Sequence, residues 1–182
     1  GEELTAGAIA LLASQGMEEV RTFERPTVRI VVTGDELADI PEKHQIRDSN
    51  GPMIEHLVAS SGAQLKERMR LGDDRGALRA ALTGADLVIV TGGASVGDRD
   101  YLADVVEEAG EKIFHGVSIR PGKPVLMGRV GDSIVFGLPG NPGSAWVCFQ
   151  LFVREALRRL AGHSNAEPSW CELPLLCSAR PY

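Results

Sequence analysis

Residues Leu87 to Asp100 read LVIVTGGASVGDRD, and this stretch decides the fold class of the chain. The run over 87–90 is apolar, mostly β-branched and without polar alternation, which predicts a strand covered on both faces, as in a parallel sheet. Gly92 and Gly93 follow at once, and a glycine-rich turn lets backbone N–H groups approach an anionic ligand closely. The stretch therefore predicts a buried strand that ends either in an anion-binding loop or in an ordinary strand-to-helix turn.

The acidic end of the same stretch has two possible roles. Asp98 and Asp100 stand just before a helix that we expect to start near Tyr101. Each carboxylate can cap that helix by accepting a hydrogen bond from a free backbone N–H, or it can hold a metal ion. The residues leave both roles open.

Outside this stretch, strand and helix signals alternate along the chain. Apolar residues at helical spacing and glycine stops predict helices over 6–14, 53–58, 77–82 and 102–109, and β-rich runs predict strands over 28–33, 113–119, 124–130 and 133–136. A last long helix is expected to carry Trp146, Phe149, Phe152, Val153, Leu157 and Leu160 on one face and to stop at Gly162. The alternation predicts a three-layer α/β/α fold with a mostly parallel sheet.

Composition narrows the functional class. The chain has 182 residues and a formal net charge of −6, which gives no electrostatic reason to expect nucleic acid as a partner. Its three cysteines, Cys148, Cys171 and Cys177, form no CxxC pair and suit reduced thiols. No apolar run approaches the roughly 20 residues of a membrane helix. We therefore expect a soluble, cytoplasmic protein without a membrane partner.

Acidic loops follow the predicted elements at two places. Asp35 and Glu36 come directly after the strand over 28–33, where ligands bind in an open α/β sheet, and they can orient a ligand hydroxyl or a metal-bound water. The trio Asp48, Ser49 and Asn50 precedes a helix, and capping is its favoured role.

Adjacent carboxylates also stand in the segment 72–74. Asp73 and Asp74 repel each other unless a cation or hydrogen-bond donors offset them, which fits a Mg²⁺ site. The segment lies just ahead of a helix, so capping is the alternative, and spacing alone favours capping.

Two proline-rich turns complete the set of unusual loops. In IRPGKP, over 119–124, prolines brace Arg120 and Lys123, so the two cations can converge on a multiply charged oxyanion. In LPGNPGS, over 138–144, Asn141 can cap a helix that has Pro142 in its first turn, and the free N–H groups there face the crevice. We favour a functional role over a plain surface turn in both cases.

Taken in series, these loops resemble one family, the molybdopterin molybdenumtransferases, which insert molybdenum in molybdenum-cofactor biosynthesis and are also represented in the C-terminal part of gephyrin. The matching segments are TGDEL at 33–37, DSN at 48–50, GDD at 72–74, TGGASVGDRDY at 91–101, RPGKP at 120–124 and LPGNPGSA at 138–145. Their order and spacing agree with the family over nearly the whole chain.

The resemblance implies a molybdopterin-binding domain that works inside a longer homodimer. Adenylylated molybdopterin and molybdate would be the substrates, AMP would be released, and Mg²⁺ would assist. By resemblance, Glu36, Asp73 and Asp100 are catalytic, and Asp73 and Asp100 also hold the metal. The residues expected to bind the pterin substrate or molybdate are Asp48, Asn50, Thr91, Gly92, Gly93, Ser95, Arg120, Lys123, Pro124, Pro139, Gly140, Asn141, Pro142 and Ser144.

The resemblance also divides the chain. Residues 1–25 are expected to be the end of a preceding domain or a linker helix, 26–162 the molybdopterin-binding α/β domain, and 163–182 the start of a truncated C-terminal β-rich domain. The chain is therefore expected to be a fragment. Gly116 and Arg120 stand where many members carry lysine, so the anion pocket is expected to differ.

Two other functions remain as alternatives. One is a molybdopterin adenylyltransferase, whose compact domain shares the glycine-rich turn but usually has a different sequence where this chain has SVG. The other is a non-catalytic molybdopterin-binding or scaffold module. Release of nucleotide on adding molybdate to bound adenylylated molybdopterin would separate the transferase from both.

Overall fold

The fold is built on one sheet of six strands. The structure, a computed structural model, describes residues 3–72, 74–92, 101–168 and 170. The strands are β1 (Thr27–Thr33), β2 (Gln64–Leu71), β3 (Leu87–Gly92), β4 (Glu111–His115), β5 (Leu126–Val130) and β6 (Ser133–Leu138). They lie in the order β2-β1-β3-β6-β5-β4, with β2, β1, β3 and β6 parallel and β5 antiparallel to both of its neighbours. The predicted, mostly parallel sheet is confirmed.

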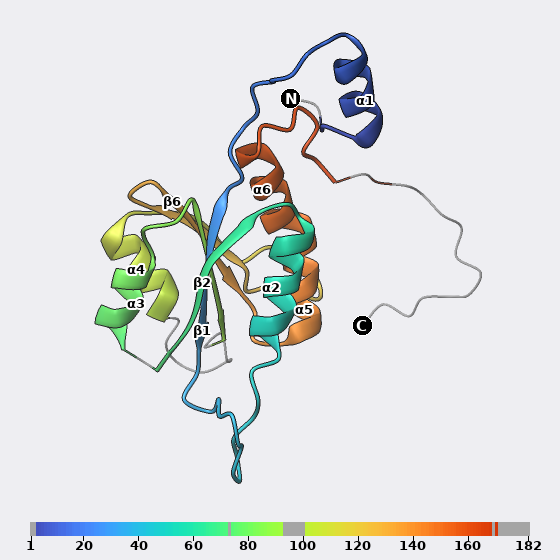
Figure 1. Cartoon of the computed structure of the whole chain (residues 1–182). Helices are drawn as coiled ribbons and strands as arrows, with labels where there is room; N and C mark the ends of the chain where they lie inside the picture. The colour runs from blue at the N-terminus through green and yellow to red at the C-terminus, as the bar shows by residue number, and fades with distance from the viewer. Residues whose placement is uncertain (1–2, 73, 93–100, 169, 171–182) are drawn as a thin grey trace, which may run out of the picture.

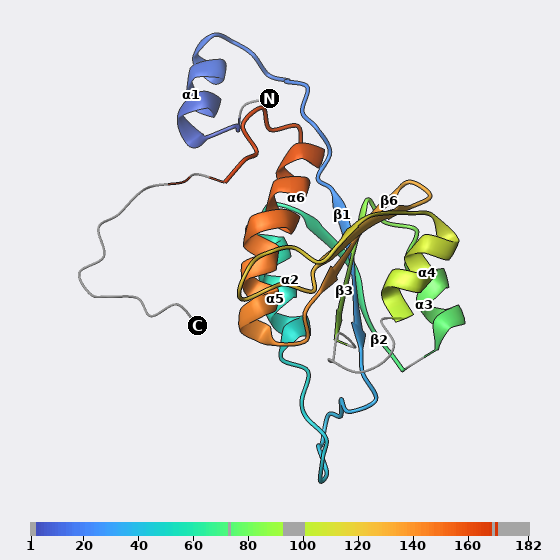
Figure 2. The same cartoon turned by 180° about the vertical axis from the view of Figure 1, so that it is seen from behind.

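Helices cover both faces of this sheet, which confirms the three-layer prediction (Figures 1 and 2). One face carries α2 (Asn50–Ser60), α5 (Pro142–Cys148), the π-helical turn η1 (Phe149–Val153) and α6 (Arg154–Leu160). The other face carries α3 (Arg75–Ala81) and α4 (Tyr101–Ala109). A further helix, α1 (Ala6–Ser14), buries none of its side chains and stands apart from the sheet.

Strand β3 contributes side chains to both hydrophobic cores, one on each face of the sheet. Along β3, Leu87 and Ile89 pack under α2 and α5, whereas Val88 and Val90 pack under α3 and α4. Side chains alternate between the faces of a strand, so a strand with helices on both faces must be apolar throughout. This is why the run over 87–90 shows no polar alternation.

The strand β2 was missed by the sequence analysis. It lies at one edge of the sheet, and its side chains alternate between exposed and half-buried. Lys66, Arg68 and Arg70 make up most of its exposed row, and such charges on an edge strand discourage pairing with another chain. The strand therefore carries no apolar run, although the alternation itself was a usable signal.

Two predicted elements need correction. The strand predicted over 113–119 ends at His115, because Gly116 adopts a left-handed conformation with φ 83°. The helix predicted to bury one continuous face is interrupted by η1, whose wider turn rotates the residues on either side of it. As a result Trp146 is 48% exposed and Leu160 is 36% exposed, while Phe149 is buried.

Among the described residues, every helix is too short or too polar to traverse a bilayer.

Candidate functional site

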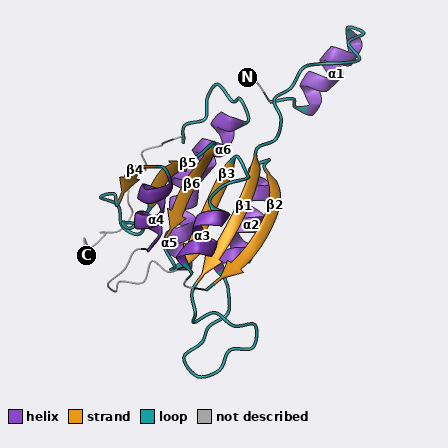
Figure 3. Cartoon of the chain, turned by 90° about the vertical axis from the view of Figure 1, so that its left-hand side faces the viewer, coloured by secondary structure: helices purple, strands orange, loops and turns teal. Residues whose placement is uncertain are grey.

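The carboxyl ends of β1, β3 and β6 lie side by side along one edge of the sheet, which we call the carboxyl edge. The register pairs Thr33 with Gly92 and Thr91 with Leu138. From β1 the chain passes outward to β2 and then returns to β3 on the other side of β1. This reversal is the topological switch point at which open α/β sheets bind ligands. Figure 3 shows β1 and β2 ending beside the long loop that leads to α2.

Asn50 joins three segments of the chain at the carboxyl edge. Its side-chain Nδ2 donates to the hydroxyl oxygen of Thr91 at 2.9 Å and to the carbonyl oxygen of Gly140 at 2.8 Å. Thr91 lies near the end of β3, Gly140 follows β6, and Asn50 is the first residue of α2. Capping by Asn50, the role favoured from sequence, is wrong, because its amide bonds other loops instead of its own helix.

Asp48 takes the capping role at this helix. Its Oδ1 accepts a hydrogen bond of 2.7 Å from the backbone N–H of Gly51. Ser49 makes no side-chain cap hydrogen bond. A Cβ atom on Gly51 would lie 2.2 Å from Asp48 Oδ2, so a side chain there would displace this carboxylate. Asp48 therefore supports the site by fixing the start of α2.

Gly92 lets β3 approach β1 at the carboxyl edge. Its φ is 95°, and a Cβ atom there would lie 1.8 Å from the carbonyl oxygen of Thr33. No side chain fits in that space. Packing of the backbone against β1 therefore requires glycine at this position, and the predicted close approach of an anionic ligand stays a prediction.

The acidic loop after β1 reaches the end of β2. Asp35 and Glu36 are both exposed. Asp35 Oδ1 lies 3.1 Å from the position of a Cβ atom on Gly72, so the TGDEL and GDD segments meet. The carboxylate of Glu36 folds back over Gly34, with both oxygens 2.7 Å from that residue's added Cβ position. The carboxylates of Asp35 and Glu36 thus face solvent at this edge, beside the end of β2.

Asp74 caps the helix that follows the GDD segment. Its Oδ1 accepts hydrogen bonds from the backbone N–H groups of Gly76 and Ala77, at 2.8 and 3.0 Å. The favoured capping interpretation is therefore confirmed for this carboxylate.

Several predicted site residues lie outside the described part of the chain: Asp73, Gly93, Ser95, Asp98 and Asp100. Within the described ranges, histidine, cysteine and carboxylate side chains form no group of three or more able to hold a metal ion. The described carboxylates alone therefore do not form the predicted Mg²⁺ site.

The LPGNPGS loop starts α5 as predicted. Asn141 is the N-cap residue, and its Oδ1 accepts from the backbone N–H of Ser144 at 3.1 Å. Pro142 is the first helical residue, where its missing N–H has no cost. Pro139 is buried. A Cβ atom added to Gly140 would lie 3.9 Å from the Cα atom of Gly92, so the loop passes close to the end of β3.

The RPGKP turn also lies at the carboxyl edge. It leads into β5, which runs antiparallel to β6 and pairs Leu126 with Gly137 near the end of β6. Arg120, Lys123 and Pro124 are exposed, whereas Gly122 is buried. Two cations and the start of α5 are thus on the same edge as Asn50.

Cys148 packs beneath this turn. Its thiol donates to the carbonyl oxygen of Gly122 at 3.5 Å, and an added Cβ on Gly122 would lie 2.6 Å from Cys148 Sγ. Burial raises the pKa of the Cys148 thiol to about 11. The residue is therefore an unreactive packing group that supports the turn.

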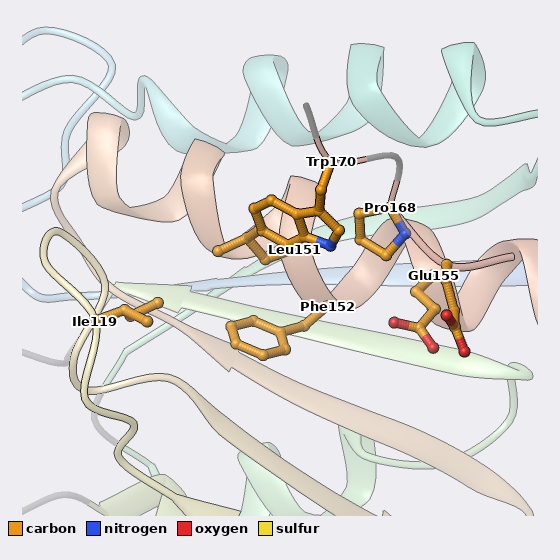
Figure 4. A pocket seen from close by; sticks show the side chains of 7 residues that line it. Ile119, Leu151, Phe152, Glu155, Pro168 and Trp170 are labelled. Carbon is orange, nitrogen blue, oxygen red and sulfur yellow. The ribbon is translucent and has the colours of Figure 1, made fainter. Parts of the chain in front are cut away.

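An apolar pocket of about 440 Å³ lies elsewhere, against η1 and α6 (Figure 4). It is lined by Ile119, Leu151, Phe152, Glu155, Glu167, Pro168 and Trp170. None of the residues predicted for the site lines it. The two glutamates on its wall both contact Arg159, at 2.8 and 3.5 Å. The pocket therefore does not coincide with the chemistry of the carboxyl edge.

Curated relatives are similar to this chain over nearly its whole length. A molybdopterin molybdenumtransferase of Staphylococcus aureus strain COL is 35% identical over 97% of the chain, and one of Staphylococcus epidermidis is also 35% identical over 97%. The chain spans 44% of the length of these relatives.

Solved structures have the same fold. A molybdopterin biosynthesis MoeA protein from Pyrococcus horikoshii is 35% identical, with a TM-score of 0.76 over 88% of this chain and 42% of its own. A molybdopterin biosynthesis Mog protein from Mycobacterium ulcerans is 21% identical, with a TM-score of 0.58 over 77% of this chain and 99% of its own, and it shows the fold alone. Residues 29–159 match the family described as "Probable molybdopterin binding domain". The chain belongs to this molybdopterin-binding domain family.

Proposed function

We propose that this chain is the molybdopterin-binding part of a molybdopterin molybdenumtransferase, which places molybdate on adenylylated molybdopterin and releases AMP. The observation that carries the proposal is the convergence of the start of α2, the end of β3 and the loop after β6 at the switch point, where Asn50 joins Thr91 to Gly140. The similarity to curated transferases over 97% of the chain supports the choice of reaction.

The charges at the carboxyl edge suit two different parts of the substrates. Molybdate is a dianion and needs fixed cations and N–H donors, which Arg120, Lys123 and the start of α5 supply. We assign molybdate to this side of the edge. The phosphate part of adenylylated molybdopterin needs a metal held by carboxylates, and we assign it to the side of Asp35 and Glu36.

Mg²⁺ is the metal that we propose. Carboxylate oxygens are its preferred protein ligands, and the carboxyl edge offers them from the TGDEL segment. The resemblance assigns the metal to Asp73 and Asp100, with Glu36 as a further catalytic acid. When bound, the metal would neutralise charge on the phosphate oxygens. Removal of Mg²⁺ by a chelator is expected to abolish AMP release and to leave the unfolding midpoint of the protein unchanged.

The test is AMP release by the full-length protein that contains this chain. The protein is loaded with adenylylated molybdopterin and Mg²⁺, molybdate is added, and AMP is measured by chromatography. Stoichiometric release that depends on molybdate is expected. Release without molybdate, or binding without release, would overturn the transferase assignment.

The same assay separates the alternatives. A molybdopterin adenylyltransferase would consume ATP and molybdopterin and would release pyrophosphate, whereas a scaffold module would bind molybdopterin without any release. We propose the transferase over both because the curated relatives that are 35% identical to the chain carry that name.

We further propose that the full-length protein is a cytoplasmic homodimer. The support is the resemblance to a family of homodimers. Light scattering of the full-length protein is expected to give twice the mass of one chain at micromolar concentration, and a monomer mass would contradict this.

A further inference from the structure

Asn50 combines deep burial with contacts to two distant loops. It is 7% exposed, although asparagine is a polar residue found mostly at protein surfaces. Its partners lie 41 and 90 positions away in the sequence. A residue that only started α2 would need neither the burial nor these contacts.

The orientation of its amide is fixed by its partners. The carbonyl oxygen of Gly140 can only accept a hydrogen bond, so the side-chain nitrogen of Asn50 must face it. The same nitrogen reaches the hydroxyl oxygen of Thr91, which is itself fully buried. Both N–H donors of Asn50 are thereby committed to the end of β3 and to the loop after β6.

The acceptor of the same side chain, Asn50 Oδ1, has no hydrogen-bond partner among the described residues. This oxygen is also buried. A buried acceptor without a donor costs about 1–3 kcal/mol, so this oxygen favours a hydrogen-bond donor from outside the described residues.

We propose that Asn50 is a positioning residue: it holds the end of β3, at Thr91, and the Gly140 loop at a fixed separation so that ligand groups can bind between them. The inference rests on the proposed function for the identity of the ligand, which is molybdopterin. It assigns to Asn50 a role that acts through its two partners, in place of the direct ligand contact expected from sequence.

The first test uses hydrogen exchange of the unliganded protein. In Asn50→Ala both hydrogen bonds are lost, and amides over 90–92 and 138–144 are expected to exchange about tenfold faster or more. Ser133→Ala is the matched control, because it removes a buried hydroxyl hydrogen bond of 2.6 Å from the opposite edge of the sheet. The control is expected to leave these amides unchanged.

The second variant is isosteric and separates positioning from general loss of packing. Asn50→Asp keeps the shape but has no donor when ionised, and its carboxylate would face the oxygens of Thr91 and Gly140. Burial without donors raises the pKa of such a carboxyl, and the protonated form regains one donor. Exchange over the two loops is therefore expected to slow again between pH 8 and pH 5 in Asn50→Asp. After correction for intrinsic exchange rates, Asn50→Ala and the parent protein should show no such slowing of exchange as the pH falls. Both proteins also contain the nearby Asp48, so they control for its titration.

Titration with molybdopterin then links the loops to binding. The parent protein is expected to bind, Asn50→Ala to bind about tenfold more weakly, and Asn50→Asp to recover affinity as pH falls. Unchanged exchange in both variants would overturn the inference, as would altered exchange with unchanged affinity. If the parent protein does not bind molybdopterin, the proposed function fails, and the exchange data alone decide whether Asn50 positions the loops.

Discussion

The two ends of the parallel strands are built in opposite ways. At the amino edge, where β1, β3 and β6 begin, Thr27 donates from both its backbone N–H and its hydroxyl to Asp86 Oδ2, each at 2.7 Å. There Ser133 donates to the carbonyl oxygen of Ala85 at 2.6 Å. At the carboxyl edge a buried acceptor on Asn50 has no donor among the described residues, and several charged side chains are exposed.

Nearby, Arg29 reinforces the amino edge. Its guanidinium pairs with Glu67 at 2.5 Å and donates to the carbonyl oxygens of Ala81, at 3.0 Å, and Thr83. These contacts fasten β1 to β2 and to the end of α3. The contrast teaches that side-chain hydrogen bonds fix the strands to one another at the amino edge, whereas at the carboxyl edge the described residues leave one buried acceptor and several charged side chains available.

The largest effect is expected where the carboxyl edge depends on backbone packing. Gly92→Ala would place a methyl group 1.8 Å from the carbonyl oxygen of Thr33, so β1 and β3 would have to separate. We expect a loss of about 4 kcal/mol or more in the free energy of unfolding, measured in urea. Gly62→Ala is the control, because Gly62 has a similar φ of 77° but open space around it. The control should lose about 1–2 kcal/mol, and equal losses would contradict the packing argument.

The next effect lies at the amino edge. Arg29→Met keeps much of the apolar stem but removes the donors to Glu67 and to the carbonyl oxygens of Ala81 and Thr83. We expect a loss of about 2–3 kcal/mol in the free energy of unfolding, because partly buried acceptors lose charged donors. Arg129→Met removes an exposed arginine that donates to the carbonyl oxygen of Gly131, and it should lose less than about 1 kcal/mol. If Arg29→Met lost no more free energy of unfolding than Arg129→Met, the stabilising role given to the amino edge would be refuted.

A smaller effect should depend on pH. Hydrogen bonds from the backbone and then the hydroxyl of Thr27 lower the pKa of Asp86 from its ordinary value of 3.8. Because the folded-state pKa is the lower one, the ionised carboxylate stabilises the fold above pH 3.8, and this contribution is lost as pH falls through the folded-state pKa.

Asp86→Asn is therefore expected to be less stable than the parent protein at pH 7, by less than about 1 kcal/mol because the carboxylate is largely exposed. The difference should shrink as pH falls below 3.8. Urea titrations at several pH values measure it. Asp132→Asn, at the exposed turn between β5 and β6, changes the net charge equally and serves as control. A difference that does not change with pH would show that the Asp86 charge is irrelevant.

The smallest effect on stability is expected from an exposed cation of the carboxyl edge. Lys123→Gln should change the free energy of unfolding by less than about 0.5 kcal/mol. Under the proposed function it should weaken molybdate binding about tenfold, since one charged donor is lost. Calorimetric titration with molybdate measures this. Lys66→Gln, which removes a cation at the amino edge, should leave the affinity unchanged; a similar decrease in both would indicate only a net-charge effect.

The sequence was most informative for the central strand β3. The apolar run over 87–90 predicted a doubly covered strand, which the structure has, and Gly92 ends that strand in close contact with β1. The edge strand β2 was missed because its many charged residues make the alternation of exposed and half-buried side chains hard to recognise. The π-helical turn could not be predicted, because a π turn differs from an α turn in backbone pairing and not in residue types.

The candidate site was predicted in its parts but not in its connections. Glycine and proline patterns located each loop, and Asn141 and Asp74 cap helices as expected. The contacts of Asn50 cross 41 and 90 positions, and no local pattern specifies which distant loop an amide will meet. Only the strand order, set by packing of the whole domain, brings them together.

The most direct test of the account is an amide chemical-shift titration of the chain with molybdopterin. We predict saturable shifts concentrated at the carboxyl edge, over 33–36, 48–51, 91–92 and 138–144, with the amides of Thr27, Asp86 and Ser133 unchanged. No saturable shift by the folded chain, or shifts centred on the amino edge, would contradict the claim that the carboxyl edge is the ligand site.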